Sequence, residues 1–252
     1  MRQNKLKERL TSKQVSYGVI TPTTDPIICE YLGLLGLDFY IIDGEHGAIG
    51  SADALAMVRA CETVGLTPLA RVRSNDPKLI LQYLDAGVMG IMMPGTDEPD
   101  DCNKLVEAIK YPPMGKRGLG PVRAANYMAG ALSQKEYIEL SNQQTLVLPM
   151  IETMECIKNL DKLVTIEGVD GFIIGPRDLA LSMGFFDGPM HPEVTTVIDH
   201  AIKTVCEAGK FVGTVAATAD QAKQLSDKGV QLLLNSVQGL LTSSVKGFLR
   251  DR

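Results

Sequence analysis

The sequence lacks several features that mark large classes of protein. Its five cysteines stand alone at positions 29, 61, 102, 156 and 206. Because no Cys-x-x-Cys pair occurs, neither a zinc clamp nor a redox dithiol is expected. No apolar run approaches the roughly 20 residues that a membrane-spanning helix needs. Residues 1–13 are polar and charged, without the hydrophobic stretch of a signal peptide. These absences predict a reduced, cytoplasmic protein with no membrane attachment.

The sequence also has fewer basic residues than acidic ones. The 252 residues include 25 Lys+Arg against 30 Asp+Glu, which gives a formal net charge of −5. A nucleic-acid-binding protein usually needs a basic face to neutralise phosphates, and a peripheral membrane protein needs one to meet anionic lipid. The charge balance therefore argues against both classes of partner and leaves small molecules.

Eight short apolar segments alternate with longer segments of helical period. The strand candidates are residues 17–20, 39–42, 68–72, 88–93, 146–151, 171–174, 211–215 and 232–234. Strands such as 39–42 and 171–174 are apolar on both faces, as parallel strands buried under helices must be. The pattern predicts an α/β protein with a single-domain (β/α)8 TIM barrel over residues 16–252, after a lead-in of residues 1–15. A doubly wound open sheet is the alternative, because periodicity does not report whether a sheet closes.

Several helix ends can be predicted from their capping residues. Residues 51–64 form a helical segment with Ser51 as its N-cap and Gly65 as its stop. Another helix begins at Asp76, before Pro77, and closes at Gly87. Residues 111–127 form the one long irregular stretch, and residues 237–249 form a last amphipathic segment. A loop as long as 111–127 in a compact domain is more often functional than idle.

Absent motifs narrow the chemistry of such a barrel. No Gly-x-Gly-x-x-Gly follows a predicted strand, so a nicotinamide site is not supported. No predicted strand ends in Lys, which argues against an aldolase that works through a Schiff base. The segments after the last two strands lack the Gly-rich turns with which barrels bind phosphate.

Charged residues do occur where several strands end. In a parallel α/β barrel the carboxyl ends of the strands carry the chemistry. The residues found there are Asp43, Glu45 and His46 after the second strand, Arg71 at the third, Glu152 at the fifth, and Gly175, Pro176, Arg177 and Asp178 after the sixth. We expect them to share one rim of the barrel.

Glu152 and Asp178 follow neighbouring strands and are candidate metal ligands. Two converging carboxylates repel each other, and a hard divalent cation removes the conflict. Two protein oxygens, with waters and substrate oxygens, suit a loosely held Mg²⁺ or Mn²⁺ ion. The alternative is that each carboxylate only caps the N-terminus of a helix.

Arg71 and His46 are the candidate catalytic side chains. Arg71 could hold a substrate carboxylate or stabilise an enolate, or it could simply pair with Asp43 or Glu45. His46 lies where a general base is expected, and the alternative is a structural role. The turn that begins at Gly175 opens a short helix, whose free N–H groups could seat a carboxylate.

Seven short motifs, taken in order, resemble those of a known family. They are DGEH at 43–46, ARVR at 70–73, YPPMGKRG at 111–118, MIET at 150–153, EGVDG at 167–171, GPRDL at 175–179 and HPEV at 191–194. Together they closely resemble the HpcH/HpaI aldolase family, which includes 4-hydroxy-2-oxoheptanedioate aldolases and 2-keto-3-deoxy-sugar-acid aldolases. The resemblance runs from about Ser16 onward.

The resemblance implies a class II aldolase that depends on a divalent metal ion (Mg²⁺, Mn²⁺ or Co²⁺). Such an enzyme cleaves a 4-hydroxy-2-oxo acid to pyruvate and an aldehyde through an enolate, as in the catabolism of aromatic compounds. It also implies a homohexamer in which the last helix is exchanged between subunits. By position, Glu152 and Asp178 match the metal ligands, His46 the general base and Arg71 the transition-state stabiliser. Asp85 matches an acidic residue that raises the basicity of the histidine.

Two residues depart from the family pattern at substrate-contacting positions. Met150 stands where a hydrogen-bonding Gln is common, and Arg177 stands where Ala is common, beside the substrate-binding backbone of Gly175 and Pro176. Oxaloacetate decarboxylation and acyl-CoA lysis use similar groups and are alternative reactions. A barrel that binds a keto acid without turnover is the non-enzymatic alternative.

Overall fold

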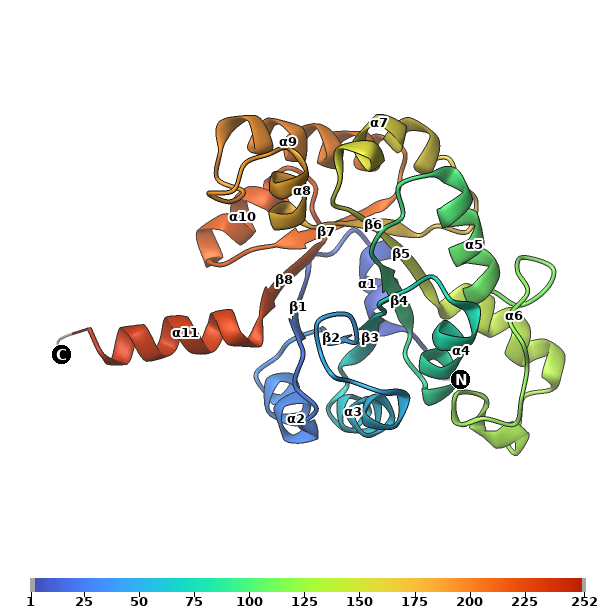
Figure 1. Cartoon of the computed structure of the whole chain (residues 1–252). Helices are drawn as coiled ribbons and strands as arrows, with labels where there is room; N and C mark the ends of the chain where they lie inside the picture. Colours follow the sequence, from blue (N-terminus) through green and yellow to red (C-terminus); the bar gives the residue numbers. More distant parts are fainter. Residues whose placement is uncertain (1–2, 251–252) are drawn as a thin grey trace.

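The computed structural model describes residues 3–250, and eight parallel strands in it close into a barrel in the order β1 to β8 (Figure 1). The strands are β1 (Ser16–Thr21), β2 (Phe39–Asp43), β3 (Thr67–Arg71), β4 (Gly90–Met93), β5 (Leu146–Ile151), β6 (Gly171–Ile174), β7 (Phe211–Val215) and β8 (Leu232–Ser236). Closure is made by β1 and β8, where Gly18 is the register partner of Leu234. The predicted (β/α)8 barrel is therefore confirmed, and the open sheet is excluded.

The helices of the described chain are α1 (Lys5–Thr11), α2 (Pro26–Leu34), α3 (Ser51–Val64), α4 (Pro77–Ala86), α5 (Pro99–Ile109), η1 (Arg123–Met128), α6 (Gln134–Gln144), α7 (Met154–Leu163), α8 (Pro176–Ser182), α9 (Pro192–Glu207), α10 (Ala219–Asp227) and α11 (Val237–Phe248). Most of them surround the barrel on its outside, while α1 closes one end of it and α11 extends away from it (Figure 1). Among the described residues, each of these helices is too short or too polar to traverse a lipid bilayer.

The apolar core has two layers, one outside and one inside the barrel. The outer layer lies between strands and helices, with residues such as Tyr40, Ile42 and Phe172. The inner layer includes Phe39 and Ile41, which alternate with the outer residues along β2. This alternation explains why the strand reads as apolar throughout: both of its faces are buried.

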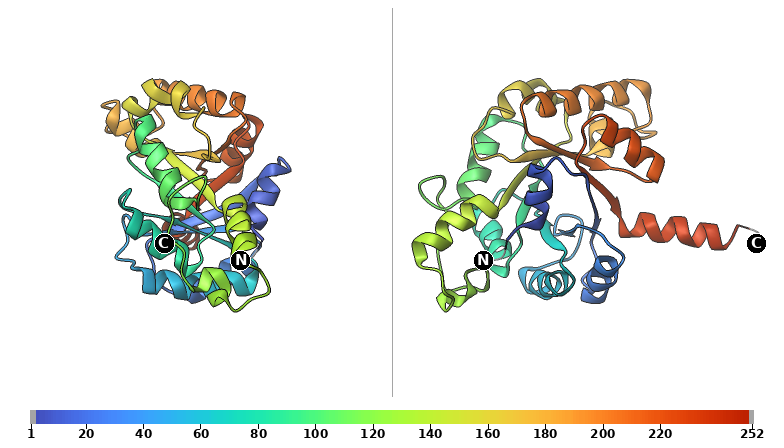
Figure 2. Two further views of the ribbon diagram at one scale, coloured as in Figure 1. Left: turned by 90° about the vertical axis from the view of Figure 1, so that its right-hand side faces the viewer. Right: turned by 180° about the vertical axis from the view of Figure 1, so that it is seen from behind.

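Helix α1 closes the barrel at the end where the strands begin. Leu6 and Leu10 are 0% and 1% exposed and belong to the inner apolar layer. Figure 2, in its right-hand view, shows α1 lying across the centre of the barrel. The lead-in residues thus contain a helix that the sequence pattern did not predict.

Predicted helix ends agree with the structure except at one position. Gly65 and Gly87 have φ values of 79° and 112°, a left-handed conformation that glycine adopts at low cost, and they end α3 and α4. Asp76 caps α4 by accepting N–H bonds from Lys78 and Leu79. The expectation for Ser51 is wrong, because Gly50 is the N-cap.

Helix α11 leaves the barrel and extends away from it (Figure 1). Three of its apolar side chains, Leu241, Val245 and Phe248, are 58%, 53% and 89% exposed. A helix that presents an apolar face to water lacks a packing partner within its own chain.

Candidate active site

The carboxyl ends of the strands bring most of the predicted residues to one rim. Asp43 and Arg71 are the last residues of β2 and β3 and are register partners. Glu152 directly follows β5, and Asp178 lies in the first turn of α8, after β6. The side chains come together because parallel neighbouring strands end at the same level.

Arg71 is held by two carboxylates. Its Nε and Nη2 donate to Oδ1 and Oδ2 of Asp43 at 2.9 and 2.7 Å, and its Nη1 lies 3.1 Å from Oε2 of Glu45. Burial alone would lower the pKa of Arg71, but the bonds and charges of Asp43 and Glu45 raise it above its ordinary value. The ion-pair alternative is thus what occurs, and it holds a fully charged guanidinium at the rim.

Glu152 lies among like charges. Its Oε1 accepts a hydrogen bond from the backbone N–H of Gly95 at 2.8 Å. Burial raises the pKa of its carboxyl group, and the nearby charges of Glu45 and Asp178 raise it further, against the opposing effects of Gly95 and Arg71. A carboxylate with a raised pKa, close to other carboxylates, is in a position that a cation would stabilise.

The donor set fits a hard divalent cation. Within residues 3–250 no three His, Cys, Asp or Glu side chains come close enough to form a complete metal cage. Two carboxylates with open positions remaining are what Mg²⁺ or Mn²⁺ accepts, because these ions keep waters and take oxygen atoms from the substrate. Glu152 and Asp178 therefore suit a loosely held ion that substrate helps to complete.

His46 is accessible at the same rim. Its side chain is 66% exposed, and its Nε2 lies 3.9 Å from Oε2 of Glu45. The backbone N–H groups of Glu45 and His46 both donate to Oδ1 of Asp43 at 3.2 Å. Asp43 therefore orders the loop that carries the histidine as well as binding Arg71.

The predicted substrate-contacting residues lie beside Glu152. A Cβ added to Gly175 would come within 3.2 Å of Cε of Met150 and 3.3 Å of Cβ of Glu152, so a side chain here would press on both residues. Met150 is 2% exposed and packs inside the barrel, whereas Arg177 is exposed. Pro176 is the first residue of α8.

Asp85 lies apart from this group within the chain. It is near the end of α4, where one oxygen lies 3.1 Å from Nη2 of Arg117. Burial raises the pKa of Asp85, and Arg117 opposes that shift. Its effect on His46 stays a prediction.

Two further groups contribute to the rim. Glu45 contacts Arg71, as the ion-pair alternative expected, and it also approaches His46, which the sequence did not indicate. Gly95 donates a backbone N–H to Glu152. Because every residue except proline has such a group, the residue type gives no signal for this contact.

Comparisons with known proteins find relatives over nearly the whole chain. The family model described as HpcH/HpaI aldolase/citrate lyase matches residues 16–243. A 4-hydroxy-2-oxo-heptane-1,7-dioate aldolase of Shigella flexneri is 35% identical over 250 residues, covering 99% of this chain and 93% of that protein. A 2-keto-3-deoxy-L-rhamnonate aldolase of Escherichia coli is 32% identical over 240 residues, covering 95% and 89%.

A solved structure shares the whole fold. The HpcH/HpaI aldolase from Desulfitobacterium hafniense DCB-2 superposes with a TM-score of 0.91 at 26% identity, covering 97% of this chain and 95% of that one. Family model, relatives and structure coincide over nearly the full length. The chain belongs to the HpcH/HpaI aldolase/citrate lyase family.

Proposed function

We propose that the protein is a class II aldolase that cleaves a 4-hydroxy-2-oxo acid into pyruvate and an aldehyde with the help of a divalent metal ion. The observation that carries the proposal is the position of Glu152 at the carboxyl end of the barrel, where it feels the negative charges of Glu45 and Asp178 and the positive charge of Arg71. The aldolases named among the relatives, at 32% and 35% identity, support the reaction class.

Glu152 and Asp178 would hold the ion, which we take to be Mg²⁺, Mn²⁺ or Co²⁺. When bound, such an ion supplies a Lewis acid that stabilises negative charge on the 2-oxo oxygen of the substrate. The N–H of Gly95 keeps Glu152 oriented toward the rim, because it occupies one carboxylate oxygen at 2.8 Å.

Arg71 would stabilise negative charge on the same keto acid. A guanidinium has five N–H groups, and the hydrogen bonds to Asp43 use two of them, while Glu45 forms an ion pair with Nη1 at 3.1 Å. The N–H groups that make no hydrogen bond to Asp43 are available to oxygen atoms of the substrate. Because Asp43 and Glu45 already hold the side chain in place, substrate binding does not have to order it.

His46 would remove the proton of the 4-hydroxyl group during cleavage and return it in the reverse direction. Its ring is 66% exposed, so a substrate hydroxyl can reach it, and its Nε2 lies 3.9 Å from Oε2 of Glu45. Asp85 would add to the basicity of the histidine, as the family resemblance implies. The turn of Gly175 and Pro176 would contact the substrate through its backbone, with the exposed Arg177 and the buried Met150 shaping the binding of the aldehyde half.

We also propose that the protein assembles as a homo-oligomer, a hexamer by resemblance, in which α11 packs against a neighbouring subunit. The exposed apolar face of α11 supports this, since no residue between 3 and 250 covers Leu241, Val245 and Phe248. The proposed location is the cytoplasm.

A chelation experiment tests the reaction. EDTA should abolish pyruvate release from a 4-hydroxy-2-oxo acid, and Mg²⁺ or Mn²⁺ should restore it. Glu152→Gln should remove the response to metal, whereas Glu155→Gln should retain it, because Glu155 lies on α7 and pairs with Lys158. Full activity after chelation, or pyruvate trapped on the protein by borohydride, would contradict the proposal. Oxaloacetate in the same assay separates aldol cleavage from decarboxylation.

A further inference from the structure

Residues 94–97, which connect β4 to α5, lie against Glu152. The strands β4 and β5 are neighbours in the barrel, so the segment that leaves β4 meets the residue that follows β5. The backbone N–H of Gly95 donates to Oε1 of Glu152 at 2.8 Å. This bond orients one carboxylate oxygen of a candidate metal ligand.

Asp97 joins the same segment to the residue after Glu152. Oγ1 of Thr153 donates to Oδ1 of Asp97 at 2.6 Å, and Nδ2 of Asn159 donates to the backbone oxygen of Asp97 at 3.0 Å. Thr153 is also the N-cap of α7, because its Oγ1 accepts the N–H of Cys156 at 3.0 Å. The hydroxyl of Thr153 therefore donates and accepts at once, and both bonds restrict its rotation.

Thr96 joins the segment to β5 on the other side of Glu152. It is 0% exposed, and its hydroxyl lies 3.3 Å from the backbone oxygen of Met150 and 3.4 Å from that of Met93. The contacts at Met150 and Thr153 lie before and after Glu152 along the chain. The segment therefore holds the backbone of Glu152 as well as its carboxylate.

The candidate metal ligands need such restraint because their charges are alike. The negative charges of Glu45 and Asp178 act on Glu152, and repulsion turns a freely rotating carboxylate away from its neighbours. Asp178 lies in the first turn of α8, and the last residue of that helix, Ser182, accepts the N–H of Met154 at 2.9 Å. Hydrogen bonds thus connect the segments that carry the two ligands and oppose their repulsion.

We propose that Asp97 is a positioning residue for the divalent metal ion. It holds the hydroxyl of Thr153, and through it the backbone that carries Glu152, so that the carboxylate is in place before the ion binds. Asp97 is not a third ligand, because within residues 3–250 no three His, Cys, Asp or Glu side chains come together as a metal cluster. Groups that orient the ligands of a metal ion typically change its affinity by about 10–100-fold. This role rests on the proposed function, because it requires that Glu152 binds the ion.

The affinity of the full chain for Mn²⁺, without substrate, tests this role, and the electron paramagnetic resonance signal of free Mn²⁺ measures it. Asp97→Asn and Asp97→Ala remove the same charge, but only asparagine keeps an oxygen that can accept the hydrogen bond from Thr153. We expect Asp97→Ala to bind Mn²⁺ about tenfold more weakly than Asp97→Asn. Thr153→Val should also weaken binding, whereas Thr153→Ser retains the hydroxyl and should restore the affinity of the wild type.

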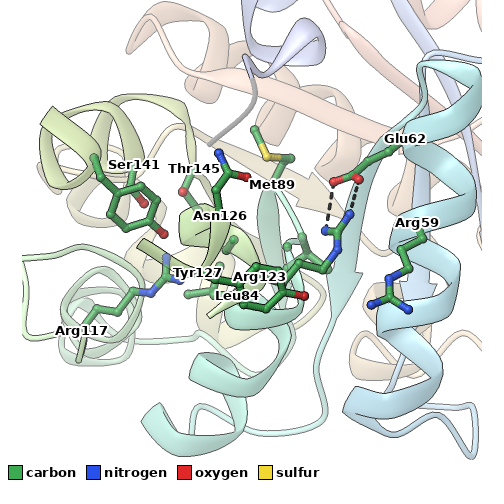
Figure 3. Close-up of a pocket in the computed structure, with 14 residues that line it drawn as sticks. Arg59, Glu62, Leu84, Met89, Arg117, Arg123, Asn126, Tyr127, Ser141 and Thr145 are labelled. Carbon is green, nitrogen blue, oxygen red and sulfur yellow. Dashed lines mark hydrogen bonds and ion pairs between the residues drawn. The ribbon is translucent and has the colours of Figure 1, made fainter. Parts of the chain in front are cut away.

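Thr145→Val is the matched control for Thr153→Val. Thr145 lies immediately before β5, where it lines a cavity of about 350 Å³ on the flank of the barrel (Figure 3). Its hydroxyl makes no hydrogen bond to any residue between 3 and 250. The same chemical change at the opposite end of the strand should therefore leave the affinity for Mn²⁺ as it is in the wild type.

Equal affinities of Asp97→Asn and Asp97→Ala for Mn²⁺ would overturn the inference and leave the proposed function standing. The same holds if Thr145→Val weakens binding as much as Thr153→Val does, because the effect would then be unrelated to Glu152. A wild-type protein that binds no Mn²⁺, or a Glu152→Gln variant that binds it as tightly as the wild type, would overturn both. Circular dichroism and the thermal midpoint establish that each variant is folded. A purely structural role of Asp97 would lower the midpoint of Asp97→Ala without changing its affinity for Mn²⁺.

Discussion

The ion pair between Asp43 and Arg71 allows a quantitative test of the candidate site. The two side chains are 5% and 11% exposed and share two short hydrogen bonds. Asp43→Asn preserves the shape of the side chain and removes its charge. At this separation the gross attraction is about 6 kcal/mol with an effective dielectric constant of about 20. Much of that attraction offsets the cost of taking both charges out of water.

The stability lost in Asp43→Asn should be near the low end of the range measured for buried ion pairs. Removing one partner of a buried ion pair typically costs about 3–5 kcal/mol, because the other charge is left unpaired. Here Glu45 remains 3.1 Å from Arg71 and still compensates its charge. We therefore expect Asp43→Asn to lower the free energy of unfolding by about 3 kcal/mol at neutral pH.

The stability lost in Asp43→Asn should become smaller at low pH. Burial would raise the pKa of Asp43, but the hydrogen bonds and charge of Arg71 hold it below its ordinary value. A group whose pKa is lowered on folding contributes stability above its unfolded pKa, which is about 3.9 for Asp. That contribution disappears as the pH falls through the lower folded pKa. The difference between wild type and variant should be constant near neutral pH and shrink below about pH 4.

Urea unfolding followed by circular dichroism, at one fixed protein concentration, measures this difference. Asp100→Asn is the matched control: it makes the same chemical change in an exposed pair with Lys104, and the unfolding midpoint should not move. A loss below about 1 kcal/mol for Asp43→Asn would refute the reasoning, since the pair would then behave like one on the surface.

Three further substitutions test other parts of the structure. Glu45→Gln removes one of the two anchors of Arg71, and we expect kcat for pyruvate release to fall about tenfold, equivalent to about 1.4 kcal/mol of lost stabilisation. Leu6→Ala opens a cavity where α1 plugs the barrel, and urea unfolding should show a loss of about 3 kcal/mol; an unchanged midpoint would mean that α1 does not close the core. Leu241→Asp places a charge on the apolar face of α11 and should dissociate the oligomer in size-exclusion chromatography, whereas Ser243→Asp should leave the elution volume as it was.

The parallel strands could be predicted because they are buried on both faces. A segment such as β5 reads as uninterrupted apolar sequence and ends at Glu152, so both the strand and its carboxyl end are visible in the sequence. Closure could not be predicted, because it depends on the pairing of β1 with β8, more than 200 residues apart in the chain.

Helix α1 escaped prediction for a different reason. It has seven residues, and its two apolar positions, Leu6 and Leu10, stand among charged neighbours. A helix this short is unstable in isolation and exists because its tertiary contacts stabilise it. The contacts that stabilise α1 are with the inner apolar layer of the barrel, and they cannot be predicted from the local sequence.

The polar contacts also differ in whether the sequence predicts them. Asp43 and Arg71 are separated by 28 residues, yet their pairing follows from the fold, because each is the last residue of its strand and parallel neighbours end side by side. The pairing of Asp85 with Arg117 follows from no such rule, since Arg117 comes from the irregular segment before η1. A sequence therefore predicts those polar contacts that the regular geometry of strands and helices enforces. The contacts made by irregular segments become visible only in the folded chain.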